Sequence, residues 1–144
     1  MVEQDKKREI SQEQAMGLLQ NERAKLNSLQ ERFNQFRVSL EETFKARDAL
    51  KNIQKANSQE SIMIPLGAGV YTTGTLSDNQ KVYITLGGGI IKSDSIPVTL
   101  KQLEIRQGEA EQELTKLQKQ LEETMGNINS LSHALQRVQK PPTQ

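Results

Sequence analysis

The residues best placed for chemistry in this sequence are glycines in a central stretch, residues 62–94. Gly69 and Gly74 have the G-x-x-x-x-G spacing of a phosphate-binding loop. The next two residues are threonine and leucine, where such a loop needs lysine and then serine or threonine. The run Gly87–Gly89 is followed by more apolar residues instead of the helix N-terminus that could hold an anion. We therefore predict turn and bulge positions, with turn glycines Gly67, Gly69, Gly74, Gly87, Gly88 and Gly89.

The remaining reactive groups also favour structural roles. His133 is the single histidine, and the chain has no cysteine, so neither a thiolate nucleophile nor a thiolate metal site is available. The glutamates at 41–42, 109–113 and 122–123 alternate with lysines and arginines, which is typical of solvated helix flanks. We expect no catalytic residue, no metal site and no cofactor.

Charge balance excludes several classes of partner. The chain has 19 basic and 18 acidic residues, and only 34% of its residues are hydrophobic. Neither sign dominates any segment, so the electrostatic signature of nucleic-acid or anionic-membrane binding is missing. The first nine residues are polar, and no apolar run is long enough to span a bilayer. We expect a cytoplasmic protein that binds neither nucleic acid nor membrane.

Two long helices with a narrow apolar seam flank the central stretch. Residues 9–56 contain one glycine and no proline and repeat apolar residues every seven positions, the pattern of a coiled coil. The expected seam there is Ala15, Leu19, Glu22, Leu26, Leu29, Phe33, Phe36, Leu40, Thr43, Arg47 and Leu50. A second helix is expected from Ser95, a suitable N-cap before Ile96 and Pro97, to about Gln139. Its seam is Leu100, Leu103, Gln107, Ala110, Leu114, Leu117, Leu121, Thr124, Ile128, Leu131, Leu135 and Val138.

The two seams predict an antiparallel register. If paired residue numbers sum to about 150, Leu50 meets Leu100 and large Leu40 meets small Ala110. The polar residues Thr43 and Gln107 then fall together.

The central stretch predicts four short strands, at 62–66, 70–76, 81–86 and 90–92, separated by glycine-rich turns. About 33 residues in four strands cannot close a core by themselves, and their free edges favour pairing with other chains in a shared barrel. The predicted assembly residues are Ile62, Ile64, Leu66, Val70, Val82, Ile84, Leu86 and Ile90. The expected fold class is thus α+β, a long antiparallel two-helix coiled coil with a central β module of two hairpins that joins an oligomeric β-barrel. We divide the chain into an N-terminal coiled-coil helix (1–61), a β-hairpin assembly module (62–94), a C-terminal coiled-coil helix (95–140) and a tail (141–144).

The far ends of the two helices carry apolar residues with little partner surface left. These residues are Ile10, Met16, Leu18, Leu19, Leu131, Leu135 and Val138. They either complete a frayed last heptad or form an adaptable surface for nonnative chains.

The order helix, glycine-rich β module, helix resembles the prefoldin family, and specifically its archaeal-type α class. The likeness lies in Ile64-Pro65-Leu66-Gly67-Ala68-Gly69-Val70-Tyr71, in Gly74-Thr75-Leu76 and in Leu86-Gly87-Gly88-Gly89-Ile90. Four strands, where β-class subunits have a single hairpin, also favour the α class. Ile90 stands where the family often has an aromatic residue.

The resemblance implies an ATP-independent holdase. In such a complex two α-type and four β-type subunits share β-barrels, and the helix ends capture unfolded polypeptides for a group II chaperonin. The alternative is a structural coiled-coil scaffold that oligomerises through its β module and binds one folded partner.

Overall fold

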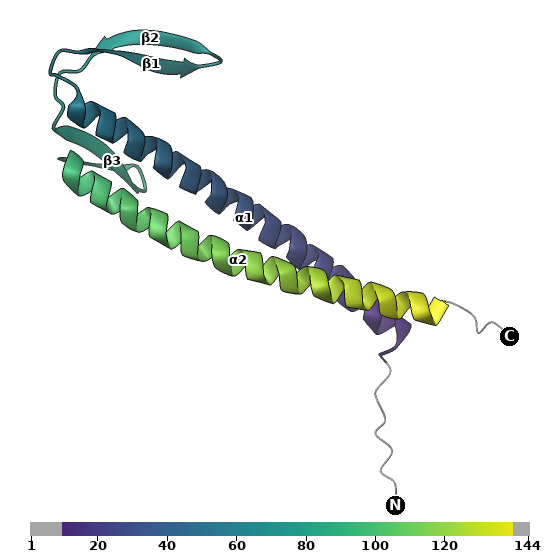
Figure 1. The fold of residues 1–144 in the computed structure, drawn as a ribbon. Helices are drawn as coiled ribbons and strands as arrows, with labels where there is room; N and C mark the ends of the chain where they lie inside the picture. The colour runs from purple at the N-terminus through teal and green to yellow at the C-terminus, as the bar shows by residue number, and fades with distance from the viewer. Residues whose placement is uncertain (1–9, 140–144) are drawn as a thin grey trace, which may run out of the picture. The chain divides into compact units, whose positions relative to one another are not determined.

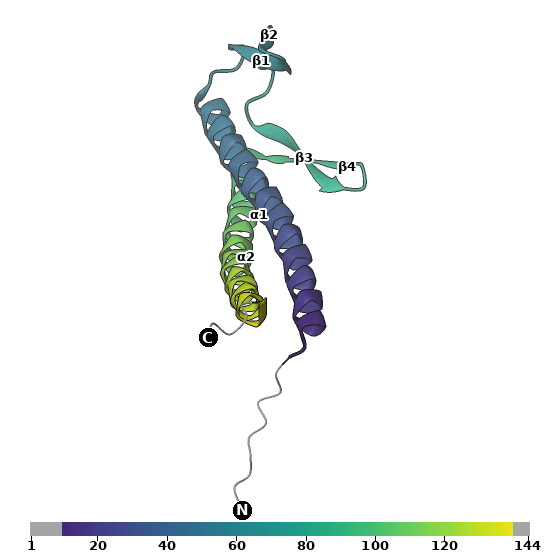
Figure 2. The same cartoon turned by 90° about the vertical axis from the view of Figure 1, so that its right-hand side faces the viewer.

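The structure is a computed structural model and describes residues 10–139. Its elements follow the order α1 (Gln12–Lys55), β1 (Ser61–Gly67), β2 (Val70–Thr75), β3 (Lys81–Gly87), β4 (Ile90–Ser95) and α2 (Ile96–Gln139), drawn in Figures 1 and 2. The predicted α+β fold of two long helices and two antiparallel hairpins is confirmed. β4 is longer than expected, because its polar residues 93–95 continue the ladder with β3.

The start of α1 is fixed by a reciprocal pair of hydrogen bonds. The Gln14 backbone N–H donates to Ser11 Oγ, and the Ser11 N–H donates to Gln14 Oε1, both at 3.2 Å. This capping box satisfies two backbone donors that a helix start leaves free. It explains why the described helix begins at Gln12, whereas the periodicity predicted residue 9, which lies outside the described residues.

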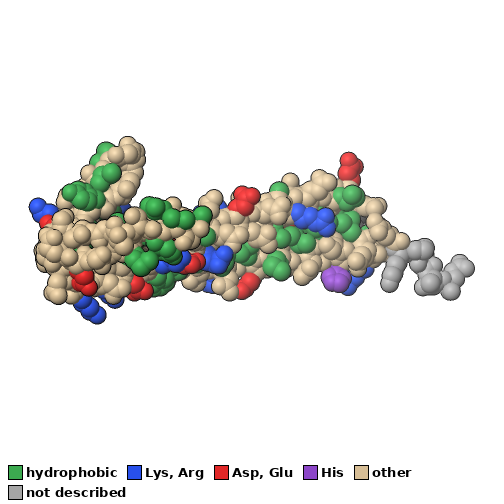
Figure 3. All heavy atoms as spheres, turned by 90° about the horizontal axis from the view of Figure 1, so that it is seen from above, with side chains coloured by type: hydrophobic (Ala, Val, Ile, Leu, Met, Phe, Trp, Pro, Cys, Tyr) green, Lys and Arg blue, Asp and Glu red, His purple; other side chains and the backbone are tan. Residues whose placement is uncertain are grey.

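Burial along both helices follows the predicted heptads. Seam residues in α2 are buried or half-buried from Leu100 to Leu135, and only Val138 at the end is exposed. In α1 the seam is likewise shielded from Ala15 to Leu50. Figure 3 shows one face of the molecule, on which hydrophobic side chains form patches along the helices among scattered charges.

The two hairpins are structural copies separated by twenty residues. In the first, Ser61 pairs with Thr75, and in the second Lys81 pairs with Ser95. Every later pair repeats at the same offset, including an irregularity before Gly67 and before Gly87. Positive φ angles also repeat at the turns, at residues 67–69 and 87–89. The hairpins form two separate two-stranded sheets.

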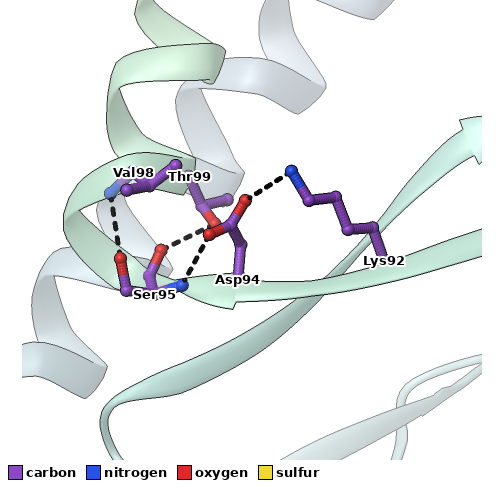
Figure 4. A network of polar contacts seen from close by, with 5 residues as sticks. All are labelled: Lys92, Asp94, Ser95, Val98 and Thr99. Carbon is purple, nitrogen blue, oxygen red and sulfur yellow. Dashed lines mark hydrogen bonds and ion pairs between the residues drawn. The ribbon is translucent and has the colours of Figure 1, made fainter.

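The junction between β4 and α2 is held by a small polar network (Figure 4). The Val98 N–H donates to Ser95 Oγ at 3.4 Å, and Thr99 Oγ1 donates to the Ser95 carbonyl at 2.9 Å. Asp94 accepts from the Ser95 N–H at 3.1 Å through Oδ1, while its Oδ2 lies 3.1 Å from Lys92 Nζ in an ion pair. The predicted N-cap at Ser95 is confirmed, and the network fixes the point at which strand becomes helix.

The chain divides into two compact units. Among the described residues, one contains residues 10–37 with 112–139, and the other contains Val38–Glu111, with both hairpins. The core of the second unit is formed by Leu50, Ile96 and Leu103, against which Val82 of β3 packs. None of the helices described between residues 10 and 139 is long and apolar enough to cross a membrane.

Candidate functional site

An open apolar groove lies where α1 begins and α2 finishes, and we call this place the tip. The groove has a volume of about 670 Å³. Both helices contribute to it, and its lining residues are Ile10, Ser11, Gln12, Ala15, Leu131, Ala134, Leu135, Arg137 and Val138. Four of the seven residues predicted for the tip therefore meet in one groove.

The groove has a buried floor and exposed rims. Ala15 is 6% exposed, whereas Ile10 and Val138, one on each helix, are 55% and 63% exposed. Ile10 stands just before the Ser11 cap and Ala15 is the fourth helical residue, positions that pack together in a hydrophobic staple. Ile10 therefore borders the groove from the position directly before the capping box.

A second groove of about 290 Å³ lies further along the same helices. Leu18 and Leu131 line it together with Glu22, Ser130 and Asn127. Asn127 Nδ2 donates to Glu22 Oε2 at 3.3 Å across the helix pair. Leu131 therefore borders both grooves.

Two predicted tip residues lie outside these linings. Met16 is 50% exposed, and Leu19 is half-buried in the seam. Their placement makes Leu19 a helix-pairing residue and leaves Met16 as a neighbouring apolar surface.

The lining of the larger groove is mostly apolar. Arg137 is the charged residue in the lining of the larger groove. Among residues 10–139 there is no group of three histidine, cysteine, aspartate or glutamate side chains that could hold a metal ion. Apolar side chains of a partner are what such a groove accepts.

The eight predicted assembly residues differ in what covers them. Ile64, Leu66, Val70, Leu86 and Ile90 are between 41% and 65% exposed, and Ile62 is half-buried. Val82 and Ile84 instead lie against the chain's own helices, and Ile84 is 8% exposed. We therefore assign Val82 and Ile84 to the core of the chain, because the strand pattern shows which face is apolar but not what covers it.

Gly74 does not occupy a turn, contrary to the prediction. It lies within β2, opposite Ile62 of β1, and its φ is not in the left-handed region. A Cβ built on Gly74 would lie 2.8 Å from Ile64 Cδ1. A side chain at position 74 would require Ile64 to move, whereas the other five predicted glycines have positive φ angles at or directly beside the hairpin turns.

A half-buried polar contact between the helices was not predicted. Arg47 Nη1 donates to Gln107 Oε1, and Gln107 Nε2 donates to Glu111 Oε1 at 2.9 Å. Thr43, the expected partner of Gln107, instead donates its hydroxyl to the Ser39 carbonyl at 2.8 Å. Arginine at a seam position is the sequence signal that could have pointed to this pair, because its long side chain reaches the next layer.

Residues 23–141 match the Prefoldin subunit family. Prefoldin subunit alpha of Nitrosopumilus maritimus (strain SCM1) is 29% identical over 143 residues, covering 92% of this chain and 98% of that protein. Prefoldin subunit alpha of Pyrococcus horikoshii is 28% identical over 95 residues, covering 65% of this chain and 64% of the relative. The fold is also similar to filamentous PFD from Methanocaldococcus jannaschii, with a TM-score of 0.66 and 15% identity over 80% of this chain and 95% of that one.

The fold, with its two hairpins between two long helices, is that of a prefoldin subunit. The chain belongs to the prefoldin family, whose members are chaperone subunits and not enzymes. The relatives named above are archaeal alpha subunits, so the resemblance noted in the sequence is confirmed. Assembly with other prefoldin subunits follows from this membership.

Proposed function

We propose that this chain captures unfolded polypeptides at its tip, without ATP, as one arm of a hexamer of two α-type and four β-type subunits. The observation that carries the proposal is the apolar groove bordered by Ile10, Leu131, Leu135 and Val138. An unfolded chain differs from a folded one chiefly in the apolar side chains that it exposes, and the groove offers matching apolar surface.

Weak contacts at one tip are sufficient when several tips act together. Two or three apolar side chains in an open groove give low affinity for a single arm. When several arms are joined to one platform, binding by one arm raises the effective concentration of the polypeptide at the others, so the overall affinity increases. Each arm can still release the polypeptide separately. This property suits hand-over of the polypeptide to a group II chaperonin, which we include in the proposal.

The exposed hairpin residues support assembly through the β module. Leu66, Val70 and Ile90 are more than half exposed near the hairpin turns. We propose that hairpins of neighbouring subunits cover these side chains in a shared barrel.

The capture proposal is tested by removing the apolar residues that α2 contributes to the groove. We expect the triple variant Leu131→Ser, Leu135→Ser, Val138→Ser to assemble normally and to lose most of its ability to suppress aggregation of a denatured protein. Light scattering during dilution of a denatured client measures suppression, and native mass spectrometry measures assembly.

The matched control is Met125→Ser, which changes an apolar residue of α2 that is 53% exposed and lies outside both grooves. Suppression by the triple variant equal to that of the control would contradict capture at the tip. A protein that ignores several unrelated unfolded clients would instead fit the scaffold alternative, in which the same β module assembles around one folded partner.

A further inference from the structure

The two hairpins repeat one register, but they differ in how they meet the helices. Ile84 of the second hairpin is 8% exposed, whereas Ile64, at the same position of the first hairpin, is 41% exposed. Val82 packs against the helical core that contains Leu50 and Ile96, and no described residue of β1 or β2 belongs to that core. Because close-packed apolar contacts resist deformation, the second hairpin is held on the helices by its side chains.

Both ends of the second hairpin are also attached to a helix. β4 ends at Ser95 and α2 begins at Ile96, so no linker separates them. The Ile96 N–H donates to the Gln80 carbonyl at 3.1 Å, which joins the residue before β3 to the start of α2. Asn79 Nδ2 donates to the Ala56 carbonyl at 2.9 Å, directly after the end of α1. These bonds anchor the strand pair at the point where it meets the two helices.

The first hairpin is closed by hydrogen bonds of its own. The Gln59 N–H donates to the Leu76 carbonyl at 2.8 Å, and the Leu76 N–H donates to the Glu60 carbonyl at 2.9 Å. Both bonds continue the antiparallel ladder of β1 and β2 beyond the two strands. Residues 59–76 therefore form a unit whose strands are held together without the helices.

Short connections join this unit to the rest of the chain. Residues 57–58 lead from the end of α1 to the first hairpin, and residues 77–78 lead from the hairpin to Asn79. These connecting residues are all exposed. Exposed connections absorb backbone rotation more readily than packed elements do, so the first hairpin can turn where the second cannot.

We propose that the second hairpin fixes the direction in which the helix pair leaves the β module, whereas the first hairpin turns about residues 57–58 and 77–78 to meet its partner. The helix pair here means residues 38–55 and 96–111, which belong to the same compact unit as both hairpins. A subunit that meets different neighbours needs one adjustable contact, and helices that must keep one direction need a fixed one. The proposal goes beyond the proposed function, since it concerns the direction of the helices and not what the tip binds.

Distances between spin labels test the proposal, and the absence of cysteine from the chain makes the labelling specific. Thr73 and Ser93 are exposed and occupy the same position in the two hairpins, and Asp48 is exposed in α1. Two variants, Thr73→Cys with Asp48→Cys and Ser93→Cys with Asp48→Cys, are labelled and diluted with unlabelled chain. We expect double electron–electron resonance to give a distance distribution at least about twice as broad for the first pair as for the second. Equal widths would overturn the proposal.

Removing the packed face of the second hairpin should release it. We expect Val82→Ala with Ile84→Ala to broaden the distribution between positions 93 and 48 at least about twofold, in the free chain and in the complex with an archaeal β-type prefoldin subunit. Ile62→Ala with Ile64→Ala changes the equivalent residues of the first hairpin and should leave this distribution unchanged. A distribution that stays narrow in either sample of the Val82→Ala, Ile84→Ala variant would show that the second hairpin does not fix the helices.

A milder variant applies if circular dichroism shows that the paired alanines have cost helix content. Asn79→Ala removes the side-chain hydrogen bond to the end of α1 and leaves the apolar core intact. We expect it to broaden the same distribution by a smaller amount. A width equal to that of the unaltered chain would contradict the anchoring of the second hairpin.

Discussion

In the first hairpin, the side chain of Ile64 packs over Gly74. The two residues lie on the same face of the β1–β2 sheet, and Ile64 Cδ1 occupies the space above Gly74. The corresponding residues of the second hairpin are Asp94 and Ile84, so the repeat conserves the register of the strands but not the contact.

We expect Gly74→Ala to destabilise the chain by about 1 kcal/mol, since Ile64 must rotate away from the added methyl group. Ile64→Val removes Cδ1 and should restore most of the lost stability in the Gly74→Ala background. Thermal unfolding followed by circular dichroism of the two single variants and the double variant gives the coupling. Additive losses would show that the two side chains do not compete for the same space.

The half-buried hydrogen bond between Arg47 and Gln107 also depends on single residues. Gln107→Leu leaves the guanidinium half-buried without its helix-to-helix acceptor, and we expect a loss of about 1–3 kcal/mol in the free energy of unfolding. Arg47→Leu combined with Gln107→Leu should recover this loss, because two apolar residues suit the seam. Chemical denaturation measures both, and a double variant no more stable than Gln107→Leu alone would contradict the argument.

At the scale of elements, the helices could be predicted from sequence. The heptad repeat of apolar residues shows which face of each helix is buried, regardless of which helix packs against it. Seam burial from Ala15 to Leu50 and from Leu100 to Leu135 follows that period. The cross-helix bond between Glu22 and Asn127, with a sum of 149, agrees with the predicted register. Partners of individual polar side chains could not be predicted, since Arg47 and Thr43 compete for positions near Gln107 and side-chain length decides between them.

The strands were harder to predict in two respects. The polar residues at the end of β4 are typical of a loop. Their backbone nevertheless stays in the strand up to Ser95, because it pairs with the backbone of β3. The apolar alternation of β3 also gave no sign that Val82 and Ile84 face their own helices instead of a neighbouring chain. Of the seven residues predicted for the tip, four line the larger groove, and Leu18 lines the smaller one together with Leu131. Periodicity identifies apolar residues near the helix ends but does not show how they divide between two grooves.

At the scale of the whole molecule, we propose that the residues beside the hairpin turns mediate assembly. Each hairpin presents exposed apolar residues beside its turn, Leu66 and Val70 in the first and Leu86 and Ile90 in the second. If both hairpins enter shared barrels, replacing either pair by serine should lower the fraction of assembled complex while leaving the helix content unchanged.

Native mass spectrometry of each variant, mixed with an archaeal β-type prefoldin subunit, measures this fraction, and Met125→Ser is again the control. Complete assembly by both hairpin variants would contradict barrel sharing. A loss confined to one pair would show which hairpin provides the interface.

The twenty-residue repeat has a consequence for how such chains can vary. An in-frame loss of residues 61–80 would bring Lys81 to the place of Ser61 and leave one complete hairpin, bulge and turn included, between two unaltered helices. An in-frame gain of twenty residues would add a third hairpin in the same way. If neighbouring subunits pair with the hairpins as we propose, the number of sheet edges available to them can change by one hairpin at a time. Such a change would leave both helices unaltered.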